Sequence, residues 1–227
     1  MKKITLLFTI GGVLALSACA RPFGSGNDFE LKKLQPNPSG VVAAEIAFNR
    51  KAREDGLWTA FRELAADDAI MLVPEAMNAK EWLKGRADPA TPPQWEAEAI
   101  YMSCDGRTAA SKGGFIGGEA LQGYYTTIWQ RRYDVRAADA DWKFLFDHGG
   151  FAGNAREKPE FVQTRIASCN GNVPVHAPQA NTRMSRDQTL KWTWDVKADT
   201  ARTLTVSIWN GSAYEPVIQD EIAATTP

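Results

Sequence analysis

Residues 57–73 read LWTAFRELAADDAIMLV, and the pattern of apolar residues changes within this stretch from helical to extended. Its first part places apolar side chains three or four positions apart, as on one face of a helix. Asp67 and Asp68 then break the pattern as polar residues that end a helix, and residues 69–73 form an apolar run that stops at Pro74. The stretch therefore predicts a helix followed at once by a buried strand.

Two further helices flank this stretch. Apolar residues recur at helical spacing from Val41 to Ala52, and Gly56 is suited to the turn that follows a helix. Asn78 has the side chain of a helix cap, and Gly85 can end the short helix that it begins. The sequence thus predicts three helices in the N-terminal part of the chain.

Beyond the third helix, apolar and polar residues alternate, which is typical of half-buried strands. Turn-forming residues such as those at 105–106 separate the runs. The expected strands are 95–103, 108–116, 123–133 and 142–146. A strongly bent antiparallel sheet packed on the preceding helices is an α+β fold.

A second group of alternating residues lies near the C-terminus. Residues 190–196 and 204–208 have the pattern of half-buried strands, and the Asn-Gly pair at 210–211 is a type I′ hairpin signal before a third run at 214–218. Residues 151–227 are therefore expected to form a loop and a three-stranded antiparallel β extension packed on the main domain.

Five segments carry a resemblance to a known family: Ala44-Glu45, Trp58-Thr59-Ala60-Phe61, Ala66-Asp67-Asp68-Ala69, 124–129 (YYTTIW) and 142–149 (WKFLFDHG). They resemble the nuclear-transport-factor-2-like (NTF2-like) superfamily, including its SnoaL-like and ketosteroid-isomerase-like branches. The resemblance implies a domain at 41–150 in which a cone-shaped sheet encloses a pocket. It indicates a fold more strongly than an activity.

The resemblance fails at the catalytic residue of the isomerase branch. That branch has an aspartate base on the strand after the Ala-Asp-Asp-Ala segment, and here the position falls on Val73, which cannot accept a proton. His148 is the best remaining candidate for a general base, with a structural role as the alternative. Asp147 would point to the opposite face of the strand and so cannot orient the His148 ring. His176 is expected to be exposed.

Aromatic residues are candidates for stacking against a ligand. The expected pocket residues are Trp82, Tyr125, Thr127, Trp129 and His148. Burial in the core is the alternative for the aromatic residues, because large aromatic side chains dominate core packing. Tyr125, Thr127 and Trp129 share one face of their strand, and the sequence leaves open whether that face lines the pocket.

Residues 1–18 are predicted to be a removable export signal. Lys2 and Lys3 form its positive start, and the apolar run at 4–16 is too short to span a bilayer as a stable helix. Residues 16–19, Leu-Ser-Ala-Cys, resemble the lipobox of bacterial lipoproteins. The alternative is an ordinary secretory signal with a cysteine at its cleavage site by chance.

The lipobox resemblance implies that Cys19 becomes the lipid-modified N-terminal residue. Two or three acyl chains anchor a protein almost permanently, so we expect a membrane-anchored domain. The residue after Cys19 is Ala20 and not the aspartate that resembles an inner-membrane retention signal. We therefore expect the protein to be anchored in the outer membrane, with the domain facing the periplasm. Residues 19–40 are expected to be the lipidated cysteine and a flexible tether.

Two cysteines, Cys104 and Cys169, lie beyond the signal. Export would place them in an oxidising compartment, so the sequence predicts a disulfide between them, with free reactive thiols as the alternative. Neither belongs to a Cys-x-x-Cys pair, and no Cys and His cluster surrounds them, so we expect no metal.

The charge balance argues against a nucleic-acid partner. The formal net charge is −1, and it becomes 24 − 27 = −3 once residues 1–18 with their two lysines are removed. With 44% apolar residues, including eight tryptophans, the chain can bury a sizeable core. No serine-hydrolase, zinc-protease or nucleotide-binding motif is present, and we expect no cofactor.

These features favour a non-catalytic envelope lipoprotein that binds a small apolar ligand or a protein partner. The first alternative is an isomerase, dehydratase or cyclase with His148 as its general base and tyrosine hydroxyls as donors. The second is a structural module that pairs as a homodimer through the open face of the sheet.

Overall fold

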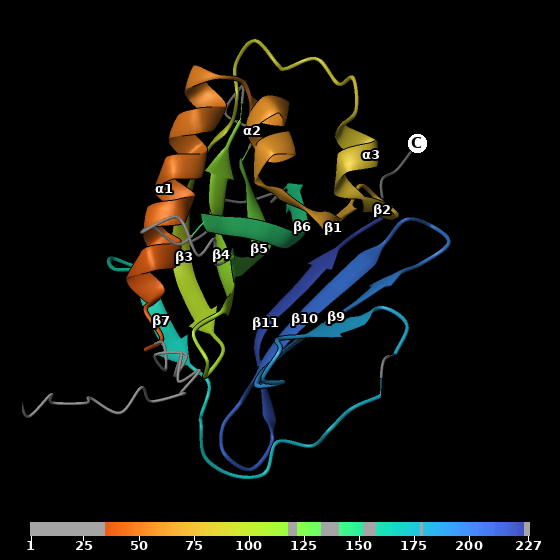
Figure 1. The fold of residues 1–227 in the computed structure, drawn as a ribbon. Coiled ribbons are helices and arrows are strands. Elements are labelled where there is room, and N and C mark those ends of the chain that lie inside the picture. The colour runs from red at the N-terminus through yellow and green to blue at the C-terminus, as the bar shows by residue number, and fades with distance from the viewer. Residues whose placement is uncertain (1–34, 118–121, 133–140, 152–157, 178, 225–227) are drawn as a thin grey trace, which may run out of the picture. The chain divides into compact units, whose positions relative to one another are not determined.

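The computed structural model describes residues 35–117, 122–132, 141–151, 158–177 and 179–224. The predicted signal peptide, Cys19 and most of the predicted tether lie outside these described residues. In Figure 1 the N-terminal helices are orange to yellow, the main sheet is mostly yellow-green to teal, and the C-terminal sheet is blue. Within the described part, no helix is both long and apolar enough to cross a membrane.

The helices are α1 (Pro38–Glu54), α2 (Leu57–Leu64) and α3 (Ala79–Leu83). α1 begins earlier than predicted because the Asn37 side chain accepts a hydrogen bond from the backbone N–H of Ser39 at 3.1 Å and so caps its first turn. Gly56 follows α1 with φ +109°, which glycine adopts without strain. Asn78 caps α3 as predicted, accepting from the N–H of Glu81 at 3.1 Å.

The main sheet has seven strands in the order β2-β1-β6-β5-β4-β3-β7 and is not closed. The strands are β1 (Ala65–Leu72), β2 (Ala76–Asn78), β3 (Gln94–Met102), β4 (Thr108–Ile116), β5 (Gln122–Arg132), β6 (Asp141–Phe151) and β7 (Gln163–Ile166). β3 to β6 form the predicted antiparallel meander, whereas β1 pairs with β6, and β7 with β3, in parallel. The α+β class is confirmed, with a sheet that is mixed rather than purely antiparallel.

Two segments are more extended than the sequence predicted. Asp67 and Asp68 do not end a helix; they lie inside β1 with exposed side chains, because the chain turns extended directly after α2, at Ala65. β6 continues past its predicted end because its pairing with β5 continues. Asp147 and His148 are therefore internal residues of a long strand.

The C-terminal sheet has four strands rather than three, in the order β11-β10-β9-β8. They are β8 (Thr182–Met184), β9 (Leu190–Val196), β10 (Arg202–Trp209) and β11 (Tyr214–Ile222). The predicted hairpin joins β10 to β11, but the N–H of Asn210 donates to the carbonyl of Ala213 at 3.0 Å across a four-residue loop, so the connection is not a two-residue type I′ turn.

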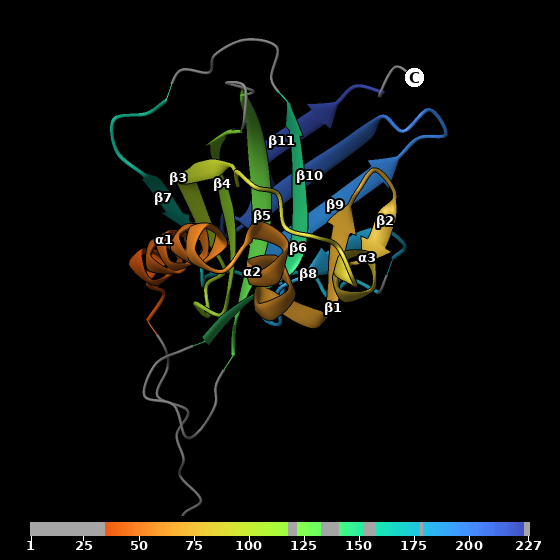
Figure 2. The same ribbon diagram turned by 90° about the horizontal axis from the view of Figure 1, so that it is seen from above.

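The main sheet lies between the helices and the C-terminal sheet (Figure 2). On the helical side, the Phe61 ring of α2 packs 5.7 Å from Phe144 of β6. On the other side, Phe146 packs 5.1 Å from Trp194 of β9. The C-terminal sheet thus covers the face through which a homodimer was expected to form, and the dimer stays a prediction.

The predicted disulfide between Cys104 and Cys169 is confirmed. It joins the turn after β3 to the segment after β7. The bond therefore fastens the start of the C-terminal extension to the main sheet.

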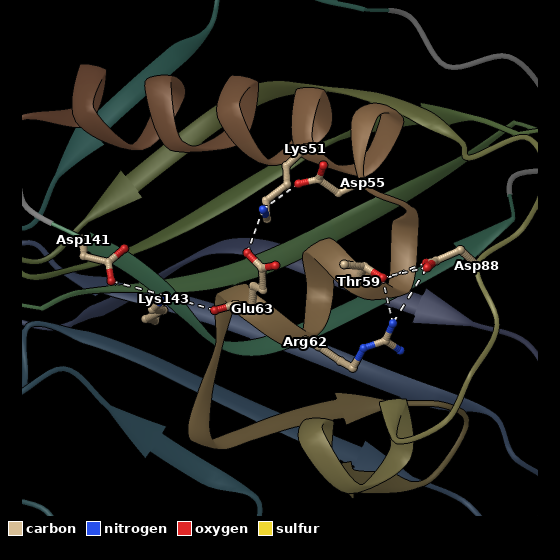
Figure 3. A network of polar contacts seen from close by, with 8 residues as sticks. All are labelled: Lys51, Asp55, Thr59, Arg62, Glu63, Asp88, Asp141 and Lys143. Carbon is tan, nitrogen blue, oxygen red and sulfur yellow. Dashed lines mark hydrogen bonds and ion pairs between the residues drawn. The ribbon is translucent and has the colours of Figure 1, made fainter.

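A polar network fastens the helices to each other and to the sheet (Figure 3). Lys51 of α1 lies 2.7 Å from Asp55 and 2.7 Å from Glu63 of α2. Lys143 of β6 donates to the backbone carbonyl of Glu63 at 2.9 Å. These contacts hold α2 over the sheet, where its inner face borders a cavity.

Candidate functional site

A cavity of about 480 Å³ lies between the helices and the main sheet. Its walls are largely aromatic and include Phe48, Trp58, Phe61, Trp82, Trp95 and Phe115. Four polar side chains also line it: Tyr125, Thr127, Asp147 and Arg202. A mostly apolar concave site with a few convergent polar groups is the usual form of a small-molecule pocket.

A distant aspartate positions the α2 wall of the cavity. The carboxylate of Asp88 accepts from the backbone N–H groups of Trp58 and Thr59 at 2.5 and 3.0 Å, and from the Thr59 hydroxyl at 2.7 Å. Figure 3 shows this carboxylate at the start of α2. A Cβ at Gly56 would lie 2.4 Å from the Asp88 carboxyl carbon, so only glycine leaves room for this cap. Trp58 is thereby fixed toward the cavity.

An irregularity in β6 decides which of its residues face the cavity. Opposite β5, Ile128 pairs with Phe146 and Trp129 pairs with Phe144, which leaves Leu145 as an extra residue. Such a β-bulge reverses the alternation of side chains along its strand. Phe144 consequently faces the helices, Phe146 faces the C-terminal sheet, and the cavity receives Asp147.

Asp147 is the only carboxyl group that the described residues place in the cavity wall. Its side chain accepts a hydrogen bond from the Thr127 hydroxyl at 2.8 Å, directly across the strand pair. Burial raises the pKa of Asp147 to about 7 against the effect of this hydrogen bond, and the nearby charge of Glu45 adds to the rise. Asp147 can therefore donate or accept a hydrogen bond, or a proton, near neutral pH.

A second carboxyl group, that of Glu45, lies buried behind the cavity wall. It accepts from the indole N–H groups of Trp95 and Trp129 at 3.0 and 2.9 Å, from the Tyr125 hydroxyl at 3.3 Å, and from the Ser111 hydroxyl. Burial raises the pKa of Glu45, while the four hydrogen bonds lower it. Glu45 thus fixes the tyrosine and a tryptophan that line the cavity.

The structure places three of the predicted pocket residues in the cavity wall: Trp82, Tyr125 and Thr127. The face of β5 that carries Tyr125 is therefore the one that lines the cavity. Trp129 shares that face but is wholly buried against Glu45 and does not border the cavity.

His148 is not placed in the cavity. The bulge turns it toward the C-terminal sheet, where it is 1% exposed and neither ring nitrogen has a hydrogen-bond partner. Burial lowers the pKa of His148 to about 4, with Arg202 and Lys112 adding to the decrease and Asp220 opposing it. The ring is therefore neutral at neutral pH and cannot reach a molecule in the cavity. His176 is exposed, as predicted.

Val73, the position at which the family resemblance implied a base, lines the cavity with an apolar side chain. Asp67 and Asp68 lie elsewhere: Asp67 pairs with Lys80, and Asp68 lies 3.4 Å from Arg183. In the described part, no group of three or more His, Cys, Asp or Glu side chains could hold a metal ion.

Comparisons with known proteins give likenesses of fold only. No family model and no curated protein matches the sequence. Among solved structures, the chain is similar to a cystatin-like fold protein from Burkholderia xenovorans, with 15% identity and a TM-score of 0.38 over 52% of this chain and 96% of that one. It is also similar to a proposed calcium/calmodulin-dependent protein kinase II association domain from Xanthomonas campestris, with 13% identity and a TM-score of 0.37 over 54% and 98%. A proposed aromatic ring hydroxylase from Novosphingobium aromaticivorans matches with 12% identity and a TM-score of 0.34 over 49% and 87%.

The sequence did not indicate the roles of Asp147, Glu45 and Arg202. A signal existed for Glu45, because it is a charged residue on the apolar stripe that contains Val41 and Phe48. No local signal existed for the other two, since one depends on the bulge in β6 and the other on the packing of the C-terminal sheet.

Proposed function

We propose that this chain is an envelope lipoprotein whose cavity binds one small, largely apolar molecule, with a polar group of that molecule facing Asp147. The observation that carries the proposal is the aromatic cavity of about 480 Å³, in whose wall the described residues place a single carboxyl group. Aromatic walls supply most of the binding free energy through apolar burial, and the one carboxyl group orients the ligand. The fold alone would not distinguish this function from others.

Filling the cavity should weaken binding. We expect the neutral probe 1-naphthylacetamide to bind the purified protein and Val73→Trp to weaken that binding at least about tenfold, because the indole would occupy the cavity. Val175→Trp is the matched control, since Val175 is 87% exposed and lies outside the cavity. Isothermal titration calorimetry measures both variants; unchanged binding by Val73→Trp would place the probe elsewhere.

Lipid anchoring is the second part of the proposal, and it rests on the Leu-Ser-Ala-Cys segment at 16–19. We expect Cys19→Ser to prevent incorporation of an alkyne-labelled fatty acid in bacterial cells, because the acyl chains need the thiol and the new amino group of that cysteine. Gel fluorescence after click labelling measures this. Full labelling of the Cys19→Ser protein would contradict the assignment.

A proton-transfer enzyme is a second candidate function, and the pKa of Asp147 near 7 favours it. The base of such an enzyme would be Asp147 and not His148, which the sequence had suggested. Asp147 would take a proton from a carbon atom next to a carbonyl group of the substrate and return it to another carbon atom. A turnover that survives Asp147→Asn would exclude Asp147 as the base.

A further inference from the structure

The C-terminal sheet contributes two residues to the cavity wall. Arg202, the first residue of β10, pairs across the strands with Ile222 of β11, and both line the cavity. These strands pack on the face of the main sheet that is turned away from the helices (Figure 2). The pair therefore borders the cavity from beyond the sheet and not from the helical side.

The end of β1 explains how Arg202 and Ile222 reach the cavity from the far side of the main sheet. β1 stops at Leu72, whereas its neighbour β6 continues for several residues and leaves part of its edge unpaired by β1. Arg202 uses this edge, where its Nη2 donates to the carbonyl of Gly149 at 3.2 Å. A Cβ at Gly150 would lie 2.6 Å from the Ile222 Cδ1 atom, so this glycine of β6 leaves room for Ile222.

Arg202 has no acidic partner among the residues that the structure describes. Within the described residues, no carboxylate lies within 4.0 Å of its guanidinium group, and its Nε is buried without an acceptor. By contrast, Lys112, in the layer between the sheets, lies 2.7 Å from Asp220. A partly buried cation without a counter-charge is unfavourable unless another group compensates it.

We infer that the cavity takes an apolar carboxylic acid, whose carboxylate pairs with Arg202. This inference rests on the proposed binding function. The guanidinium group offers donors in a planar fork that matches a carboxylate, and the aromatic wall would hold the apolar body of the acid. The C-terminal extension, which lies outside the family resemblance, then determines which ligands the cavity selects.

Matched acids and amides test this inference. The probes are 1-naphthylacetic acid with 1-naphthylacetamide, and octanoic acid with octanamide, titrated calorimetrically into the purified full chain at about pH 6. At this pH the acids are ionised while Asp147, with its pKa of about 7, is mostly uncharged. We expect each acid to bind at least about tenfold more tightly than its amide.

Arg202→Gln should remove this preference by weakening binding of the acid about tenfold more than binding of the amide, and Arg202→Lys should retain part of it. Arg186→Gln, an exposed change of equal charge between β8 and β9 and outside the cavity wall, should leave the preference intact. Thermal melting of each variant shows whether it is folded, and the amide titration shows whether its cavity is intact.

The outcomes separate the two proposals. Equal binding of acid and amide, or a preference that survives Arg202→Gln, overturns the carboxylate inference and leaves the binding function standing. If neither member of either pair binds the unmodified protein, the binding function fails and the inference fails with it.

Discussion

Asp147→Asn is expected to raise the free energy of unfolding by about 4 kcal/mol at about pH 8 and to leave it nearly unchanged at about pH 4. In the folded protein the pKa of Asp147 is raised from its ordinary value of 3.8 to about 7. Between these values the unfolded chain has lost the proton while the folded chain still binds it, so stability falls as the pH rises. Asparagine stays uncharged and can still accept the Thr127 hydrogen bond, so the variant avoids this loss.

Urea unfolding followed by circular dichroism across this pH range measures the difference between the two proteins. His148 does not disturb the comparison, because its lowered pKa destabilises both proteins alike as the pH falls from 6.5 towards 4. If the difference in free energy of unfolding between the variant and the unmodified protein did not change with pH, Asp147 would titrate like an exposed aspartate. The expected gain also indicates that Asp147 is kept for a reason other than stability.

Glu45→Ala is expected to destabilise the fold by roughly 3 to 5 kcal/mol. The change removes the acceptor of four side-chain hydrogen bonds, from Trp95, Ser111, Tyr125 and Trp129. Burying these donors without a partner costs free energy for each of them, and a cavity is left as well. The same urea experiment measures this loss.

Two further variants test whether the lost hydrogen bonds cause the destabilisation by Glu45→Ala. Glu45→Gln should be intermediate, because it keeps the volume and one acceptor oxygen but places an amide donor among donors. Glu54→Ala, an exposed change in the same helix, should stay within about 0.5 kcal/mol of the unmodified protein. If Glu45→Ala lowered the free energy of unfolding no more than Glu54→Ala does, the four hydrogen bonds would contribute nothing to stability.

Most of the elements could be predicted because their signals are local. The helix cap at Asn78, the alternation in β3, β4 and β9, and the hairpin near Asn210 depend on residues close in sequence. The strands β7 and β8 have only four and three residues, too few for a periodic pattern. Their positions are set by the strands beside them.

The site could be predicted only in part, and β6 shows why. Strict alternation from Phe144 places His148 on the helical face of the sheet. The extra residue Leu145 reverses this and places Asp147 there instead. A bulge is a property of two paired strands, so neither strand indicates it alone.

Two other features depend on contacts between distant segments. Asp88 caps α2 from a position 30 residues beyond Trp58, and nothing in its proline-rich surroundings connects it with that helix. Arg202 belongs to a strand whose alternation predicts pairing but not which edge of the main sheet it will meet. Such contacts need the assembled fold.

The most direct test of ligand binding in this cavity is an NMR titration of the tryptophan indole N–H signals. Of the eight tryptophans, three line the cavity, Trp58, Trp82 and Trp95, so each signal reports on a known place. Single Trp→Phe variants assign the signals. On addition of 1-naphthylacetic acid, we expect the signals of these three to shift and saturate together, while those of Trp192 and Trp209 stay in place. Shifts confined to tryptophans outside the cavity, or none at all, would contradict the proposed function.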